Sequence, residues 1–301
     1  MDASIVIRTK NEEEFIGETL ERVRKQEFNG EYEIVVVDCG STDSTLQIVE
    51  KYDVRLLKIP PREFTYGRSL NMGARSAAGE FVVNLSAHAL PSGKKWLTNL
   101  VSGFEDDKVA GVYGRQVSNG RLNPFEARRN EQFFGTVKIT FAPFNRAVSQ
   151  KLHFSNANSA VRREVWQKFN FNERVRYAED ILWQSDVMRA GFSIVYVPNS
   201  IVYHTHKLNI CNAYKNSRNC AYELAQMAQK KRSIPSVGWD LGVFLWIVST
   251  SMFYNLAYVL RNRYLNTLKV LPWYVIAEGL GWLGGRMDYR LAKNRSEGGS
   301  Y

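Results

Sequence analysis

The sequence lacks the patterns of several common protein classes. Its three cysteines, Cys39, Cys211 and Cys220, are odd in number and have no metal-ligand spacing, so neither a disulfide framework nor a cysteine-based metal site is expected. No apolar leader opens the chain, because the short run 5–7 gives way at once to the charged Arg8. We therefore expect free thiols in the reducing cytoplasm.

Two further absences concern function. Residues 8–14 contain no glycine, although a nucleotidyltransferase would need a glycine-rich phosphate loop near its N-terminus. No nucleic-acid-binding module is recognisable, so no nucleic-acid partner is expected despite a net charge of +10. Residues 207–301 hold 13 basic and 5 acidic side chains and therefore most of that charge. A basic, aromatic-rich tail fits an anionic membrane surface better.

The sequence does contain an alternation of strands and helices, and with 301 residues, 45% of them hydrophobic, it can bury a full core. Residues 33–45, EIVVVDCGSTDST, run from a β-branched apolar strand into a polar turn, and helical spacing follows. Strands are also expected at 4–8, 54–59 and 80–85. The alternation predicts an α/β fold with a Rossmann-like, mostly parallel sheet and helices on both faces. Ligands bind such sheets at the carboxyl ends of strands, although an ordinary capped turn is the alternative here.

The first helix is expected directly after the first strand. Asn11 is its predicted N-cap, and the acidic residues 12–14 suit the positive end of a helix. Its predicted inward face consists of Ile16, Leu20 and Val23, which are spaced three and four residues apart.

Another helix is expected within residues 64–78, FTYGRSLNMGARSAA. Arg68, Asn71 and Arg75 are three and four residues apart, so they share one face of that helix. Arg68 could reach a phosphate from there, and a solvated basic face is the alternative interpretation.

Six short motifs follow one another along the first 206 residues. They are IRTKNE (7–12), DCGSTD (38–43), GRSLNMGA (67–74), LSAHALP (85–91), AED (178–180) and YVPNSIVYHTH (196–206). Each is weak alone, but six in this order resemble the family 2 glycosyltransferases with a GT-A fold, most closely the branch that includes rhamnosyltransferases of surface-polysaccharide synthesis. The resemblance implies a GT-A catalytic domain over 1–206, with a nucleotide-binding half at about 1–115 and an acceptor half at about 116–206.

The resemblance also implies a nucleotide-sugar site. Thr9, Glu12 and Asp38 match positions that hold the base and ribose, and Asp43 closes the same turn. Arg68 matches a basic position on the helix after the third strand. Ser86 and His88 complete the predicted site at the end of the fourth strand.

The metal-binding Asp-x-Asp of the family is altered in this chain, since Ser86 replaces its first Asp and His88 its last. A neutral imidazole can bind Mn²⁺, whereas Mg²⁺ prefers carboxylate oxygens. We therefore expect Mn²⁺ rather than Mg²⁺ if a divalent metal acts. His204 and His206 end another predicted strand and point the same way by period two. His206 is the favoured second ligand, and a structural histidine is the alternative.

The acidic pair Glu179 and Asp180 precedes a predicted helix at 181–190. Acidic residues favour a helix N-terminus in any case, but the family order assigns Asp180 as general base and Glu179 as an acceptor-binding neighbour. Arg115, Gln116 and Asn158 match segments that face the acceptor in the rhamnosyltransferase-like branch.

The resemblance implies an inverting glycosyltransferase that uses a nucleoside-diphosphate sugar and a glycan or lipid-linked acceptor for cell-surface polysaccharide. No Gln-x-x-Arg-Trp follows the acidic pair, and this absence favours a single transfer over processive synthesis. A nucleotidyltransferase and an inactive glycosyltransferase-like scaffold are the alternatives.

Residues 207–301 are predicted to form a helical extension. The charge-free run 241–260 is just long enough to cross a bilayer, whereas the apolar run 271–285 is too short. We expect two helices lying against the inner face of the cell membrane, with three tryptophans at headgroup level, Trp246, Trp273 and Trp282. A helical cap on the catalytic domain or a dimer interface is the alternative.

Overall fold

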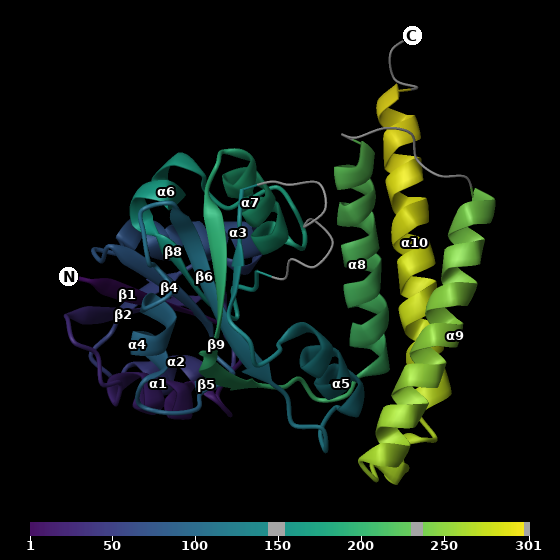
Figure 1. The fold of residues 1–301 in the computed structure, drawn as a ribbon, viewed down its shortest axis with the longest axis horizontal. Coiled ribbons are helices and arrows are strands. Elements are labelled where there is room, and N and C mark those ends of the chain that lie inside the picture. Colours follow the sequence, from purple (N-terminus) through teal and green to yellow (C-terminus); the bar gives the residue numbers. More distant parts are fainter. Residues whose placement is uncertain (144–153, 230–236, 298–301) are drawn as a thin grey trace. The chain divides into compact units, whose positions relative to one another are not determined.

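The computed structural model describes residues 1–143, 154–229 and 237–297 (Figure 1). The predicted acceptor half and helical extension thus lie partly outside the described residues. The chain divides into two compact units. The catalytic unit comprises Met1–Asn119, Arg129–Val175 and Glu179–Thr205, and the helical unit comprises Gly120–Arg128, Arg176–Ala178 and His206–Tyr301. Two short segments that the sequence analysis placed in the catalytic domain therefore group with the helical unit.

The nine strands that the structure describes form one mixed sheet. Its order is β3-β2-β1-β4-β8-β6-β9-β5, and β7 pairs with β9. The pairings among β1 to β4 are parallel, as is that of β6 with β9, whereas β8, β5 and β7 pair antiparallel. The bounds are β1 (Ala3–Thr9), β2 (Tyr32–Asp38), β3 (Arg55–Lys58), β4 (Phe81–Ser86), β5 (Ala89–Pro91), β6 (Val109–Val117), β7 (Ile139–Phe141), β8 (Asn158–Arg162) and β9 (Ser193–His204).

Helices cover both faces of this sheet because residues of its strands alternate between two cores. Ile5 and Ile7 of β1 pack with α1, α2 and α4 on one face, whereas Val6 packs with α3, α6 and α7 on the other. The predicted alternation of strands and helices is confirmed. The helices and one 3₁₀ turn are α1 (Ile16–Arg24), α2 (Thr45–Val49), η1 (Pro61–Glu63), α3 (Tyr66–Ser76), α4 (Trp96–Val101), α5 (Pro124–Phe133), α6 (Arg163–Lys168) and α7 (Glu179–Arg189).

The predicted start of the first helix is wrong. Helix α1 begins at Ile16, and Asn11 lies outside it with a left-handed φ of 53°. The Asn11 carboxamide oxygen accepts from the backbone N–H of Thr42, and the Asn11 N–H donates to Ser41 Oγ. Asn11 therefore does not cap the helix but forms hydrogen bonds with the turn that follows β2. The predicted buried face of the helix is nevertheless confirmed.

The helical unit is built on α8 (Ile210–Gln229), α9 (Val237–Arg261), η2 (Leu265–Thr267) and α10 (Leu271–Glu297). Helix α9 coincides with the predicted run 241–260, α10 extends well beyond 271–285, and α8 was not predicted. At the start of α9, the buried Asp240 carboxylate accepts from Arg286 at 3.1 Å and also from Arg290. This ion pair fixes α9 to α10. Among described residues, only Gly238–Arg261 is long and apolar enough to cross a membrane.

Glycines on α10 permit its close approach to α8. A Cβ at Gly285 would overlap the carbonyl oxygen of Arg218, and one at Gly281 would overlap that of Tyr214. Residues four apart lie on one helix face, so this small-residue stripe lets the two backbones meet. Replacement of either glycine must push the helices apart, because the obstacle is backbone.

We expect Gly285→Ala to lower the free energy of unfolding by about 1–3 kcal/mol through overpacking. The measurement is helical circular dichroism during thermal and urea unfolding of the full chain. Gly242→Ala is the matched control, because Gly242 is exposed on α9 with nothing near its missing Cβ. That change should raise stability by about 0.5–1 kcal/mol. Equal effects of the two substitutions would contradict the close helix approach.

Candidate active site

The carboxyl ends of three neighbouring strands bring several predicted site residues together. Thr9 at the end of β1 is in register with Asp38 at the end of β2, and Arg8 is in register with Ser86 on β4. The Thr9 hydroxyl and Asp38 are almost completely buried, and Thr9 Oγ1 has no hydrogen-bond partner among the described residues. An orphaned hydroxyl at such an edge is suited to a ligand, since burial without a partner is costly.

The turn after β2 is held by Asp38 itself. One carboxylate oxygen accepts from the N–H of Gly40 at 3.0 Å, and both accept from Ser41 at 3.2–3.3 Å. Gly40 has a φ of +84°, and a Cβ there would overlap Pro61. Only glycine meets both requirements without strain. The turn is therefore preorganised, with backbone amides directed at a carboxylate.

Asp43 closes the same turn, as the sequence analysis expected. Its carboxylate accepts from the N–H of Thr45 at 3.0 Å and of Glu13 at 3.2 Å. Burial acts to raise the pKa of the Asp43 carboxyl, but the hydrogen bonds from Thr45 and Glu13 outweigh it and leave the pKa lowered. Asp43 thus supports the turn and the start of α2. Its predicted nucleotide contact stays a prediction.

Glu12 is joined to His88 and through it to His204. The distance from Glu12 Oε1 to His88 Nδ1 is 2.7 Å, and His88 Nε2 lies 3.1 Å from His204 Nε2. The two rings are stacked, with centroids 4.9 Å apart. The pairing arises because β5 and β9 place Ala89 opposite His204.

This pair of imidazoles fits a divalent metal. Two nitrogen ligands, each about 2.1 Å from one ion, lie roughly 3.0–3.4 Å apart, which is the separation found here. A carboxylate on the far nitrogen of a metal-binding histidine fixes its tautomer and orientation, and Glu12 occupies that place beside His88. The donor set is nitrogen-rich and so suits Mn²⁺ better than Mg²⁺.

His206 belongs to the helical unit. Strand β9 ends at His204, so His206 lies two residues beyond the strand. His206 Nδ1 lies 2.8 Å from Glu126 Oε1, and its N–H donates to Glu126 Oε2 at 2.9 Å. Glu126 is 5% exposed, so this contact anchors His206 locally. A metal-binding role of His206 stays a prediction.

The two predicted catalytic carboxylates begin α7. Asn156 donates from its backbone to Asp180 at 3.4 Å and from its side chain to Glu179 at 3.5 Å. Desolvation, followed by the neighbouring Glu179 charge, raises the pKa of Asp180 to about 7, although part of the residue reaches the surface. Burial also raises the pKa of Glu179, against the opposing charge of Arg8. A carboxyl that titrates near neutrality can act as a general base.

Arg8 is a site residue that the sequence analysis did not identify. It lies on β1 beside Thr9, its guanidinium carbon is 4.5 Å from the centroid of the Tyr66 ring, and it lowers the pKa of Glu179. Its Nη1 is buried and has no hydrogen-bond partner among the described residues. An arginine within a buried apolar strand is a signal that could have revealed it. Arg8 thus links Glu179 to the strand ends that carry Thr9 and Asp38, which we call the predicted nucleotide edge.

The predicted basic face of α3 is only partly available. Asn71 is buried and donates to the carbonyl of Phe171 at 2.8 Å, while Arg75 is paired with Glu173. Arg68 is exposed on the first turn of α3 and lies 2.7 Å from Glu63. A surface pair of this kind is weak enough for a phosphate to compete. Its predicted contact with the diphosphate stays a prediction.

The three residues that were predicted to contact the acceptor differ in their hydrogen bonding. Arg115 Nε and Gln116 Nε2 are buried on β6 without a hydrogen-bond partner among the described residues. Asn158 is completely buried, and its amide accepts from Trp96 Nε1 while donating to the carbonyls of Arg115 and Ser200. Since nothing of Asn158 is left for an acceptor, we replace its predicted contact with a structural role between strands.

Comparisons with known proteins identify the family of the chain. Residues 4–169 match the family described as Glycosyl transferase family 2. The O-antigen chain rhamnosyltransferase WbaN of Salmonella anatum is 29% identical over 186 residues, which are 60% of this chain and 59% of that protein. RfbN of Salmonella typhimurium, also an O-antigen chain rhamnosyltransferase, is 24% identical over 68% of this chain and 67% of its own. The matches thus span about three fifths to two thirds of these relatives.

Solved structures share the fold. A mannosyltransferase from Pyrobaculum calidifontis in complex with GDP-Man and Mn²⁺ aligns with a TM-score of 0.60 at 19% identity, over 97% of this chain and 87% of that one. TarS of Staphylococcus aureus with UDP aligns with a TM-score of 0.56 at 21% identity, over 97% and 92%. The predicted GT-A fold is confirmed. Because the family match covers more than half of its residues, the chain belongs to glycosyl transferase family 2.

Proposed function

We propose that this protein is an inverting glycosyltransferase that moves one sugar from a nucleoside-diphosphate sugar to a hydroxyl of a glycan or lipid-linked acceptor. The observation that carries the proposal is the Glu179–Asp180 pair, where Asp180 has a pKa raised to about 7 and Arg8 connects the pair to the nucleotide edge. Related proteins are O-antigen rhamnosyltransferases, and solved neighbours bind GDP-Man or UDP. These likenesses support a role in cell-surface polysaccharide synthesis.

In the proposed reaction, the acceptor hydroxyl gives its proton to Asp180 while its oxygen bonds to the anomeric carbon. The bond from that carbon to the diphosphate breaks on the opposite face, so the configuration inverts. Arg8 and Arg68 supply positive charge for the departing diphosphate. A metal held by His88 and His204 would neutralise further charge there. The unpaired donors of Arg115 and Gln116 would orient the acceptor.

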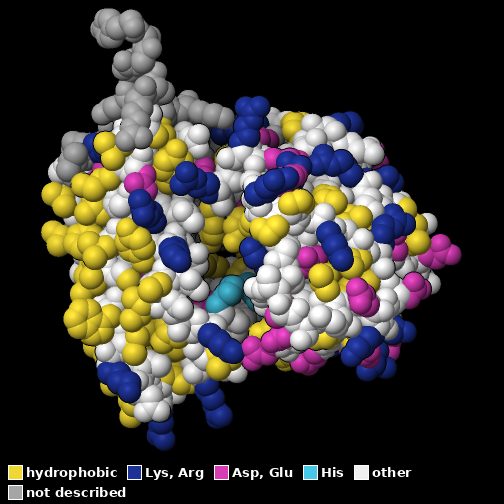
Figure 2. Space-filling view, turned by 180° about the vertical axis from the view of Figure 1, so that it is seen from behind, with side chains coloured by type: hydrophobic (Ala, Val, Ile, Leu, Met, Phe, Trp, Pro, Cys, Tyr) yellow, Lys and Arg dark blue, Asp and Glu magenta, His cyan; other side chains and the backbone are white. Residues whose placement is uncertain are grey.

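The proposed location is the inner face of the cell membrane, reached through the helical unit. Hydrophobic side chains gather over its helices (Figure 2). Those on α9 that are more than half exposed are Trp239, Leu245, Trp246, Phe253, Tyr254 and Leu260. Only 11% of the most apolar window of Gly238–Arg261 is buried. Arg261 ends this helix and Arg263 follows it, so apolar area and positive charge together suit an anionic bilayer surface.

We expect Asp180→Asn to lower turnover by about two to four orders of magnitude, because the amide cannot accept the proton. The affinity for nucleoside diphosphate, measured by calorimetry with UDP, GDP and dTDP, should stay nearly unchanged. Near-normal turnover in a folded variant would contradict the assignment.

The pH profile gives a second readout of Asp180. A base with a raised pKa is protonated and inactive below it, so wild-type turnover should rise with pH up to about 7 and then level off. The same raised pKa favours the folded state at low pH, and this contribution is lost as pH rises to about 7. Asp180→Asn should therefore gain thermal stability relative to wild type above pH 7.

For the metal, we expect Mn²⁺ to bind more tightly than Mg²⁺, with His88→Ala weakening Mn²⁺ binding by at least tenfold through loss of an imidazole ligand. Electron paramagnetic resonance of free Mn²⁺ measures this without turnover. The exposed Lys168→Ala serves as the control. Strong Mg²⁺ binding with the same affinity in wild type and in His88→Ala would contradict this metal site.

For the membrane, we expect Trp246→Glu with Phe253→Glu to reduce co-sedimentation with phosphatidylglycerol vesicles by tenfold or more. Each large side chain contributes about 1.5–3 kcal/mol when it leaves water. Val137→Glu is the control, since Val137 is 71% exposed on the catalytic unit. If the control and the test variant lose binding equally, the helical unit is not the membrane contact.

A further inference from the structure

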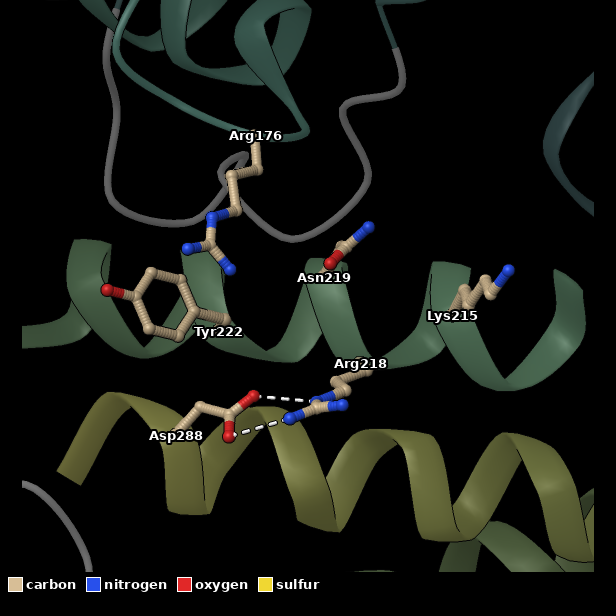
Figure 3. A pocket seen from close by; sticks show the side chains of 6 residues that line it. All are labelled: Arg176, Lys215, Arg218, Asn219, Tyr222 and Asp288. Atoms are coloured by element: carbon tan, nitrogen blue, oxygen red, sulfur yellow. Dashed lines mark hydrogen bonds and ion pairs between the residues drawn. The ribbon is translucent and has the colours of Figure 1, made fainter. Parts of the chain in front are cut away.

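A cationic hollow lies within the helical unit. It has a volume of about 330 Å³ and is lined by Arg176, Lys215, Arg218, Asn219, Tyr222 and Asp288. Figure 3 shows Asn219 between Arg176 and Lys215 along the same side of α8, with Arg218 and Asp288 between α8 and α10. The size is at the lower end of small-molecule sites.

The hollow has more positive than negative charge. Arg218 donates to both oxygens of Asp288, at 2.6 and 2.9 Å, so these two charges compensate each other. Within the described ranges, neither the Arg176 guanidinium nor the Lys215 ammonium has an ion-pair partner. The buried Glu223 is the other nearby carboxylate, and it accepts from the backbone N–H of Arg176 at 2.9 Å. Two exposed cations are thus available to an anion.

Arg218 and Arg176 are held in place by the packing of the unit. The close approach at Gly285 brings the backbone of Arg218 against α10, where Asp288 fixes its guanidinium. Arg176 is anchored by its own backbone to Glu223, and its guanidinium carbon is 5.8 Å from the centroid of the Tyr222 ring. A site that is ordered before binding loses less side-chain entropy when a ligand arrives.

The donor set indicates the ligand. Guanidinium and ammonium groups with an amide between them match the oxygens of a phosphoryl group, which takes several charge-assisted hydrogen bonds. Helix α10, which carries Asp288, also has an exposed apolar face. Trp273, Leu280, Met287 and Leu291 are exposed and spaced by seven, seven and four residues, so they share one face of the helix. Met287 directly precedes Asp288.

The chain connects this hollow to the chemistry. Arg176 is three residues before Glu179, so their Cα atoms are at most about 11 Å apart whatever the arrangement of the two units. We propose that the hollow binds the phosphate or diphosphate of a lipid-linked acceptor, whose chain follows the apolar face of α10. The inference rests on the proposed function and specifies its acceptor class.

The test is calorimetric binding of farnesyl diphosphate to the full chain, with saturating nucleoside diphosphate present to occupy the donor site. Wild type should bind it at least tenfold more tightly than a variant with Arg176→Ala and Lys215→Ala, because two charge-assisted contacts are lost. The matched control combines Arg121→Ala with Lys269→Ala, which removes the same charges from exposed positions of the same unit. Its affinity should stay within twofold of wild type.

Each outcome decides the proposal. Equal affinity of the pocket variant and wild type overturns it, and so does equal loss in the control, which would indicate nonspecific charge. Inorganic pyrophosphate and farnesol measure the contributions of the diphosphate and of the lipid chain separately. If both bind more weakly than farnesyl diphosphate, the hollow prefers a lipid diphosphate. If pyrophosphate binds as tightly as farnesyl diphosphate, the lipid part of the proposal is overturned. Wild type that binds none of UDP, GDP and dTDP would refute the proposed function instead, independently of the pocket variant.

Discussion

The burial of two adjacent carboxylates at the start of α7 is the constraint on which the catalytic unit depends. Glu179 and Asp180 repel each other, and burial raises the pKa of both. Asn156 donates to each of them, and Arg8 supplies the opposing charge from the middle of the sheet. Since Arg8 is also the neighbour of Thr9, the charge balance at Glu179 is linked to the predicted nucleotide edge. Loss of the Arg8 charge would raise the pKa of Glu179 further.

Backbone strain occurs next to both parts of this site. Asn11 and Ala178 are non-glycine residues with φ of 53° and 64°, each at a cost of order 1–3 kcal/mol. Asn11 is held by its hydrogen bonds with Ser41 and Thr42. Ala178 directly precedes Glu179 and marks the return of the chain from the helical unit to the catalytic unit. Such conformations persist where surrounding contacts determine them, which is typical of functional sites.

The helical unit combines a tight internal contact with an apolar exterior. Glycines let α10 meet α8 backbone to backbone, and the buried Asp240 joins α9 to α10 through Arg286. The outward residues of α9 remain largely apolar and exposed, in a unit whose basic residues outnumber its acidic ones. Exposed apolar faces of this kind usually mark interaction surfaces, and this face is the basis of the proposed membrane contact.

Local sequence patterns determined much of this protein. Apolar runs and turn residues were sufficient to predict the parallel strands and the turn at Gly40. The spacing of apolar residues and the backbone preference of each residue depend only on residues that are close in sequence. Motif order was sufficient for the family and for the candidate base Asp180. The tertiary structure decided what depends on distant partners. It moved Asn11 from a helix cap to the turn after β2, committed Asn158 to strand contacts and placed His204 against His88, because strand pairing and burial choose partners that sequence spacing does not encode.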